Sequence, residues 1–408
     1  MISRTLALKL FEGFFIQRWN DRIRPVDLTE MDKNAHKAFL TYFIAKEEES
    51  VNGSHLDWTY LINGLVFAFL KNIVLSDIKS SVHRRIRDSH PDEFEKLNRW
   101  VIEQYGVLID NNDLLDDFKN FLFDDPGDKK EFRILRAAHK LSTQREFKII
   151  EHANGSNPNL EKLDRQLLKD LTDFTDLSFV NQYNLKQEVF DLFCIIEQLR
   201  FQLRWSQTPR IPPTSVLGHS FLVACLGFFI ARNGNYQPGR TYNLFWGSLF
   251  HDIPESVTRD IVSPIKNITP TLRAAISKVE KEICEAELYP LIPEHCREEI
   301  HYFTADSSEN LDEFKNRIME NGVARPLGEN EDINNFDDSF RPLDGVIVKF
   351  CDEIAAFLEA QQSIEIGIAT KHIRQGYWSI LSKYEDQDIV QKFQKQYNID
   401  VRRFFRSF

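Results

Sequence analysis

Apolar residues recur at intervals of three and four positions along most of this chain, and this period constrains the fold more than any other feature. Such spacing gives an α-helix one apolar stripe, because the helix has about 3.6 residues per turn. The two-residue alternation that is typical of half-buried strands is nearly absent. We therefore predict an all-α fold. The predicted helices cover residues 36–45, 58–75, 94–104, 114–123, 159–174, 186–204, 217–231, 241–250, 271–288 and 344–362.

Two segments depart from the helical pattern. Residues 304–343 are polar and acidic and lack helical periodicity, which predicts a long surface loop, either a solvated insertion or a flap over a substrate. Residues 208–214 contain three prolines, which cannot continue a helix and impose an extended approach to the next helix. We expect this proline-rich approach to belong to the functional site.

Charge and cysteine content narrow the expected partners and location. The chain has 51 Lys and Arg against 62 Asp and Glu, a net charge of -11. Extended nucleic acids are bound mainly by clustered basic residues, so we expect none here, whereas a small phosphate ester needs only one local basic group. The five cysteines form no CxxC pair, which predicts reduced core thiols and a cytoplasmic protein. The longest apolar stretch, residues 221–231, falls short of the roughly 20 residues that cross a bilayer, so no membrane partner is expected.

Three predicted helices carry groups that are costly to bury. Each group alone could be an ordinary core residue with a satisfied hydrogen bond. A buried imidazole needs a partner, however, and a buried carboxylate needs a cation or strong donors. Two imidazoles and two carboxylates together suit a divalent transition ion and leave positions open for water and substrate. These four residues, called the ligand set below, are His219, His251, Asp252 and Asp352.

Glu255 is a candidate for proton transfer. It follows His251 by four residues and shares its helical face if the helix continues. A carboxylate there that is not needed as a ligand could exchange protons with water or a leaving oxygen. The alternative is a surface ion pair between Glu255 and Arg259.

The order of the ligand set along three helices resembles that of the HD-domain metal-dependent phosphohydrolases. The fuller string HDIPESVTRDIVSPIK, with Arg204-Trp205 fifteen residues before His219, is similar to the bacterial 5'-deoxynucleotidase branch. The similarity spans roughly residues 195–385. It implies that the ligand set binds one divalent metal ion, and the sequence leaves open whether this is Mn, Co, Ni, Fe, Zn or Mg.

The resemblance also implies roles for the remaining site residues. Glu255 matches the catalytic carboxylate, Arg204 and Trp205 match a pair that meets phosphate and sugar, and Asp260 matches a position near the sugar hydroxyl. The implied reaction is metal-assisted hydrolysis of nucleoside monophosphates to nucleoside and phosphate, and we expect the deoxy forms to be the substrates. The alternatives are hydrolysis of nucleoside triphosphates, cyclic nucleotides or another small phosphate ester. A different class of function is a regulatory or scaffolding protein that binds a nucleotide without turnover.

The N-terminal half resembles the C-terminal half. Residues 18–36 are similar to residues 204–219, and an offset of 183 then aligns residues 61–80 with 244–263 without a gap. This offset pairs His36 with His219. We interpret the similarity as a tandem duplication.

The first copy has lost the metal motif. Ala68 and Phe69 stand at the positions of the His-Asp pair, Asn72 stands at that of Glu255, and His139 is the approximate counterpart of Asp352. An apolar pair cannot bind a cation. We therefore predict that this copy binds no metal. Together with the duplication, this predicts two HD-type helical domains in tandem.

The predicted boundaries separate a degenerate, metal-free copy over residues 1–185 from an active copy over residues 186–408, which carries the acidic insertion 304–343. The insertion could reshape substrate entry. The expected partners are a small nucleotide or phosphate ester and, as one option, a second copy of the chain in a homodimer.

Overall fold

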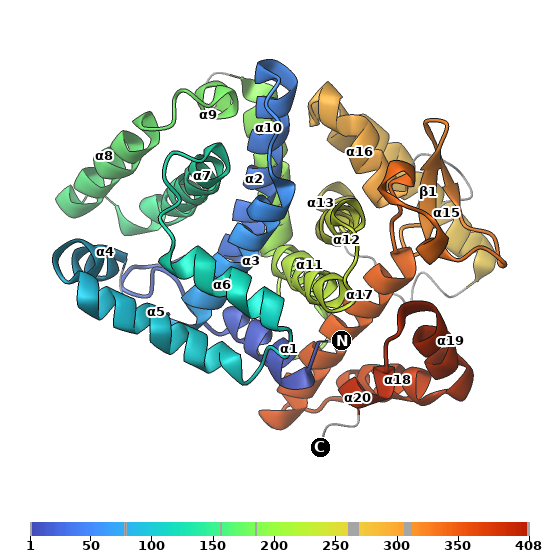
Figure 1. The fold of residues 1–408 in the computed structure, drawn as a ribbon. Coiled ribbons are helices and arrows are strands. Elements are labelled where there is room, and N and C mark those ends of the chain that lie inside the picture. Colours follow the sequence, from blue (N-terminus) through green and yellow to red (C-terminus); the bar gives the residue numbers. More distant parts are fainter. Residues whose placement is uncertain are drawn as a thin grey trace.

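The computed structural model describes residues 2–76, 78, 80–155, 157–183, 186–259, 269–305 and 312–405. Its regular elements are almost all α-helices, which confirms the all-α class (Figure 1). The helices of the N-terminal half are α1 (Arg4–Phe11), α2 (Glu30–Asn52), α3 (Trp58–Val74), α4 (Ser80–Ser89), α5 (Pro91–Gly106), α6 (Asn112–Phe123), α7 (Lys130–Asn154), α8 (Pro158–Thr172) and α9 (Ser178–Tyr183).

The C-terminal half is also mainly α-helical and contains one small β-hairpin. Its helices are α10 (Gln187–Phe201), α11 (Val216–Asn233), α12 (Pro238–Phe250), α13 (Glu255–Thr258), α15 (Pro270–Ile283), α16 (Glu294–Thr304), α17 (Gly345–Glu365), α18 (Lys371–Glu385), α19 (Gln387–Tyr397) and α20 (Val401–Phe405). The strands are β1 (Arg317–Glu320) and β2 (Val323–Pro326). The short helical turns are η1 (Glu12–Phe14), η2 (Cys284–Leu288), η3 (Tyr289–Leu291), η4 (Ile333–Asn335) and η5 (Asp338–Phe340).

Helix α11 is the centre of the core. Every residue from Val216 to Ala231 is buried, and the helix packs against α2, α10, α12 and α17. Helix α2 approaches it closely at Gly218, where a Cβ atom would lie 2.9 Å from Asp32 Oδ1. By length and composition α11 could cross a membrane, but its neighbours cover it as they cover a core helix of a soluble protein. A polar side chain on this helix is therefore withdrawn from bulk water.

The two halves repeat one local structure. In each half an Arg-Trp pair precedes a capped helix, and Trp19 and Trp205 both have left-handed backbone conformations, with φ of 55° and 58°. Each indole N–H donates to a buried glutamate on a long helix, to Glu146 of α7 at 2.9 Å and to Glu359 of α17 at 2.7 Å. A duplication would leave this shared geometry, and the tandem duplication stays a prediction.

The helix caps set the register between the halves. Thr29 caps α2 and Ser215 caps α11, each by accepting a hydrogen bond from a main-chain N–H of the first turn. Matching these caps gives an offset of 186 residues between α2 and α11. The shift of three residues from the predicted offset places Lys33, rather than His36, at the position of His219.

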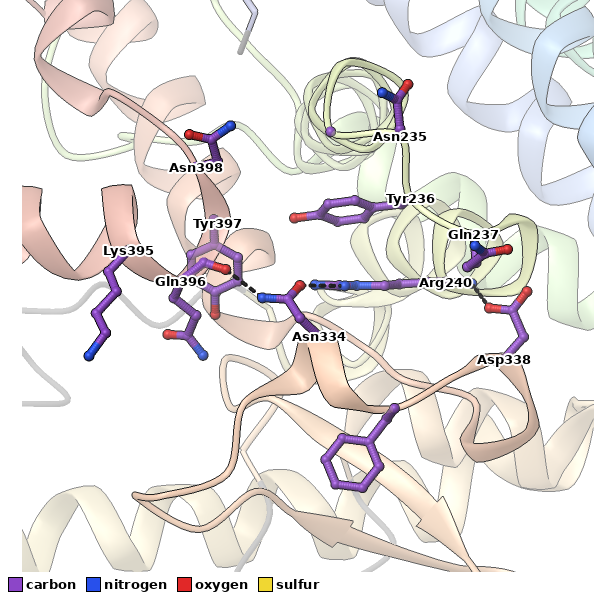
Figure 2. A pocket seen from close by; sticks show the side chains of 12 residues that line it. Asn235, Tyr236, Gln237, Arg240, Asn334, Asp338, Lys395, Gln396, Tyr397 and Asn398 are labelled. Atoms are coloured by element: carbon purple, nitrogen blue, oxygen red, sulfur yellow. Dashed lines mark hydrogen bonds between the residues drawn. The ribbon is translucent and has the colours of Figure 1, made fainter.

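The acidic segment contains no α-helix among its described residues 312–343, as predicted, but it does contain the unpredicted β1–β2 hairpin. Its far end is tied to the start of α12. Arg240 donates to Asp344 at 2.6 and 2.8 Å and to Asn334 at 2.8 Å, and Asp338 accepts from the main-chain N–H of Gly239 at 2.8 Å. Arg240, Asn334 and Asp338 border a cavity of about 360 Å³ (Figure 2). The far end of the segment is therefore fixed against the helical core.

Candidate metal centre

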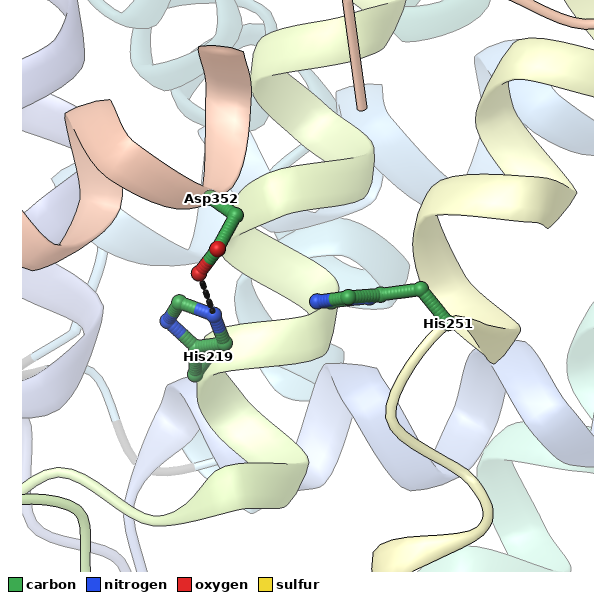
Figure 3. A group of neighbouring side chains, drawn as sticks. All are labelled: His219, His251 and Asp352. Carbon is green, nitrogen blue, oxygen red and sulfur yellow. Dashed lines mark hydrogen bonds and ion pairs between the residues drawn. The ribbon is translucent and has the colours of Figure 1, made fainter. Parts of the chain in front are cut away.

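Three helical elements bring members of the ligand set together (Figure 3). His219 comes from α11, His251 follows the last residue of α12, and Asp352 comes from α17. One ligand atom from each lies within 4.8 Å of the other two, and His219 Nε2 is 3.0 Å from Asp352 Oδ1. Asp252 joins them, with its Oδ2 3.2 Å from His251 Nε2 and 3.9 Å from His219 Nε2. The structure thus places all four predicted residues around one point.

The end of α12 orients the His251 ring. Its Nδ1 lies 2.7 Å from the main-chain carbonyl oxygen of Ser248, within the last turn of the helix. A proton on Nδ1 donates to this carbonyl and leaves the Nε2 lone pair directed at the other ligand residues. A main-chain carbonyl commonly fixes a metal-binding imidazole in this way.

The site combines two partly buried carboxylates with two buried imidazoles. Burial raises the pKa of Asp252, but His251, His219 and Arg204 outweigh it and hold that pKa at about 2. Burial likewise raises the pKa of Asp352, while Lys349, His219 and Arg204 lower it well below its usual range. Two ionised carboxylates beside two imidazoles form a donor set that fits a divalent cation. The residues present therefore fit the metal that the sequence predicts.

Arg204 points into the ligand set. Its Nη1 lies 3.9 Å from Asp252 Oδ2, and its Nη2 lies 3.7 Å from Asp352 Oδ1. Its Nε donates to Glu359 at 3.3 Å. The guanidinium is thus held beside both carboxylates, a position that suits an anionic ligand.

Trp205 is held by contacts with two helices. Its indole N–H donates to Glu359. Its ring packs on α18 at Gly376, where a Cβ atom would lie 2.4 Å from Trp205 Cη2. The ring is therefore held between α17 and α18, and its predicted contact with a sugar stays a prediction.

Glu359 is a site residue that the sequence reasoning missed. Its carboxylate is fully buried and accepts hydrogen bonds from Arg204, Trp205 and Thr214, the last at 2.8 Å. It also lies 3.6 Å from His219 Nδ1. Burial raises its pKa, but the neighbouring Arg204 and His219 bring that pKa far below its usual range. Its position in an apolar helix, seven residues after Asp352, is the signal that could have identified it.

The proline-rich approach leads into the site, as expected. Thr214, at its end, donates to Glu359, and Arg210 donates to Thr214. Thr208 makes a hydrogen bond with Thr370, just before α18. The approach therefore links the Arg-Trp pair to α17 and α18.

Glu255 begins a new helix instead of continuing that of His251. Helix α12 ends at Phe250, a turn follows, and α13 starts at Glu255. The predicted four-residue relation on one helical face is therefore wrong. The turn is nevertheless fixed, because the Glu255 N–H donates to the Asp252 carbonyl at 3.1 Å and the Glu255 carbonyl accepts from Gln202 at 3.0 Å. Asp260 lies outside the described residues.

When the two halves are aligned on their helix caps, the residue of the N-terminal half at the position of His219 carries an amine. Lys33, which is 1% exposed, donates to the His139 carbonyl at 2.9 Å and to Thr143 at 2.6 Å. Burial lowers the pKa of Lys33 well below its usual range. Phe69 is buried and packs on Phe221, with ring centroids 5.2 Å apart. Lys33 and Phe69 are thus both packed into the interior of the N-terminal half. The metal-ligand grouping found in the described part of the chain lies in the C-terminal half.

Two further residues touch the ligand set. Lys349, one turn before Asp352 on α17, lies 2.8 Å from Asp352 Oδ2. Phe314 comes from the acidic segment, and its ring centroid is 6.2 Å from that of His251. The acidic segment therefore reaches the site, a contact that its sequence did not reveal.

Comparisons with known proteins agree with this geometry. Residues 196–381 match the family model of the HD domain. The 5'-deoxynucleotidase of Vibrio cholerae is 26% identical over 124 residues, which make up 30% of this chain and 63% of the relative. That of Pasteurella multocida is 26% identical over 186 residues, 44% of this chain and 77% of the relative. The chain thus spans less than two thirds of the Vibrio cholerae relative, and no solved structure matches the chain significantly.

Proposed function

We propose that this chain, which carries an HD domain and resembles the 5'-deoxynucleotidases, is a divalent-metal-dependent phosphohydrolase of nucleoside 5'-monophosphates. Its products are a nucleoside and phosphate, with deoxynucleotides as the first substrates to test, and its location is the cytoplasm. One observation carries the proposal: His219, His251 and Asp352 converge, Asp252 lies against both imidazoles, and Arg204 is directed at both acids.

The ligand set would hold one ion, which the donor types allow to be Mn, Co, Ni, Fe, Zn or Mg. When bound, such an ion polarises a phosphoryl oxygen and makes water a better nucleophile. Side chains of the chain bind the phosphate and transfer protons. Arg204 binds the phosphate, Glu359 holds Arg204 in place, and Glu255 accepts or returns a proton at the reacting oxygens. Asp260 is assigned to the sugar.

The domain assignment is part of the proposal. Residues 186–408 act as the catalytic copy, and residues 1–185 as a metal-free copy that supports it. Support comes from the contact between the copies at the start of α11, where Ser215 donates to Asp32 while capping that helix. A purely regulatory nucleotide-binding role fits less well, because the second copy has kept its complete set of ligand residues.

Phosphate release tests the proposal. The purified protein is supplied with Mn, Co, Ni or Mg and incubated with deoxynucleoside mono- and triphosphates and a cyclic nucleotide. We expect release from monophosphates, and a loss of roughly a hundredfold or more in His251→Ala. His295→Ala is the matched control, because this histidine is on α16 and faces Glu47 at 3.5 Å. Equal release by wild type and His251→Ala would overturn the proposal.

A further inference from the structure

The contact of Trp205 with a sugar stays a prediction, and the structure shows other partners for this ring. Trp205 has its indole N–H on Glu359 and its ring against Gly376. A nucleoside is a large, flat leaving group, and flat aromatic side chains are well suited to contact it. A further aromatic ring beside the ligand set would suit this contact.

Phe314 provides such a ring. It lies beside His251, at the 6.2 Å centroid separation given above, and is only partly buried. Lys349 Nζ lies 4.3 Å from the centroid of the Phe314 ring and 2.8 Å from Asp352 Oδ2. One cation thus joins the ring to the ligand set, so an anionic ester with a flat substituent would meet both a positive charge and an aromatic face.

Arg317 holds the loop that carries this ring. Its side chain is fully buried, and its guanidinium donates to main-chain carbonyls at both ends of a short stretch of chain. The acceptors are Tyr302 at 2.9 Å, Phe303 at 2.9 Å, Glu313 at 3.0 Å, Lys315 at 3.1 Å and Asp312 at 3.5 Å. A buried guanidinium is costly unless its donors are satisfied, and these hydrogen bonds fix the main chain of residues 312–315 against the end of α16.

The neighbouring Glu313 faces the same space. Burial raises its pKa to about 7, with Asp312 adding to the rise, and the charges that act on it include those of His251 and Asp252. The main-chain N–H of Phe314 donates to Asp312 Oδ1 at 2.8 Å, which fixes the direction of the loop at this point. The hydrogen bond to Asp312 thus holds the main chain of Phe314 in place.

We propose that residues 312–317 of the acidic segment form one wall of the substrate pocket, with the Phe314 ring against the nucleoside. Phe314 is then a specificity-determining residue, and Arg317 positions it. This inference rests on the proposed function. It predicts that the chain prefers phosphate esters with a flat aromatic base over small aliphatic esters.

Substrate comparison in variants tests this inference. We expect Phe314→Ala to raise the KM for a deoxynucleoside monophosphate about tenfold, the usual value of one aromatic contact. Phosphate release from glycerol 3-phosphate should change less than twofold. Phe336→Ala is the control, because Phe336 belongs to the same segment but packs on Phe340, with ring centroids 5.3 Å apart. Phe314→Leu keeps the apolar volume and should fall between wild type and Phe314→Ala.

The outcomes separate the two proposals. If wild type releases phosphate from nucleotides but the KM of Phe314→Ala is unchanged, or both substrates lose activity equally, the wall is refuted and the proposed function stands. If wild type releases phosphate from no ester, the proposed function is what fails. Calorimetric titration with the deoxynucleoside monophosphate then tests the wall without turnover, since Phe314→Ala should still weaken binding about tenfold.

Discussion

Replacing Glu359 with glutamine should weaken metal binding although Glu359 is not a member of the ligand set. The substitution keeps the size of the side chain and removes its charge. Arg204 then loses the carboxylate on its Nε and keeps Asp252 and Asp352 as its acidic neighbours, at 3.9 and 3.7 Å. The positive charge of Arg204, no longer neutralised by Glu359, then competes with a metal ion for the carboxylates of Asp252 and Asp352.

The size of this effect follows from the position of Glu359. Its carboxylate also lies 3.6 Å from His219 Nδ1, so its loss removes the anion behind one ligand imidazole. Changes to such outer partners typically cost about 10- to 100-fold in metal affinity. This range corresponds to about 1.4 to 2.8 kcal/mol. We expect Glu359→Gln to lie within it.

Calorimetric titration with Mn²⁺ measures the affinity directly. Glu353→Gln is the matched control, because Glu353 is on the same helix but pairs with Lys383 and Tyr384 at 2.7 Å. We expect the control to bind Mn²⁺ within about twofold of wild type. The reasoning is refuted if Glu359→Gln binds as tightly as wild type, or if both variants lose affinity equally.

Two further predictions concern stability. Burial raises the pKa of Glu146, but Arg18, Lys33 and Arg200 outweigh it and hold that pKa at about 2, below an ordinary value of about 4.5. The stability that ionised Glu146 contributes, about 3 kcal/mol, is complete above pH 4.5 and is lost as the pH falls toward 2. The free energies of unfolding of wild type and Glu146→Gln, measured with urea, should therefore converge at low pH. A difference that stays constant with pH would contradict this. Gly376→Ala forces the Trp205 ring from α18 and should cost about 1 to 3 kcal/mol in unfolding free energy, so an unchanged melting temperature would show that the ring can move freely.

The sequence predicted helices best where the interior of the helix is apolar. Helix α11, buried along its length, was predicted as residues 217–231 and runs from Val216 to Asn233. Helix α7 was missed, because Ser142, Gln144 and Glu146 are buried in it and interrupt the apolar stripe. Tertiary partners of these polar groups, which no local pattern contains, make their burial possible.

The β1–β2 hairpin was missed for a different reason. Each strand has four residues, too few for alternation to be recognised. The turn did leave a signal, since Asn321 and Gly322 both have positive φ, and Asn-Gly is the preferred sequence for a tight hairpin turn. This turn type could have been predicted.

The ligand set was visible because a charged residue in an apolar helix is costly without a partner. Glu359 is also a charged residue in an apolar stretch, on the same helix as Asp352, so it could have been identified. No local sequence signal identifies Phe314, because its contact with His251 depends on the path of a loop held by Arg317. Loop paths of this kind are fixed by distant main-chain contacts and not by local composition.

Metal content per chain tests the central claim most directly. We predict one equivalent of divalent metal in wild type after dialysis against limiting Mn²⁺, and none in His251→Ala. We also predict a full equivalent in His36→Ala, because His36 is buried beside Ser142 in the half whose corresponding site is occupied by Lys33. Equal metal in wild type and His251→Ala, or loss of the equivalent in His36→Ala, would contradict the account.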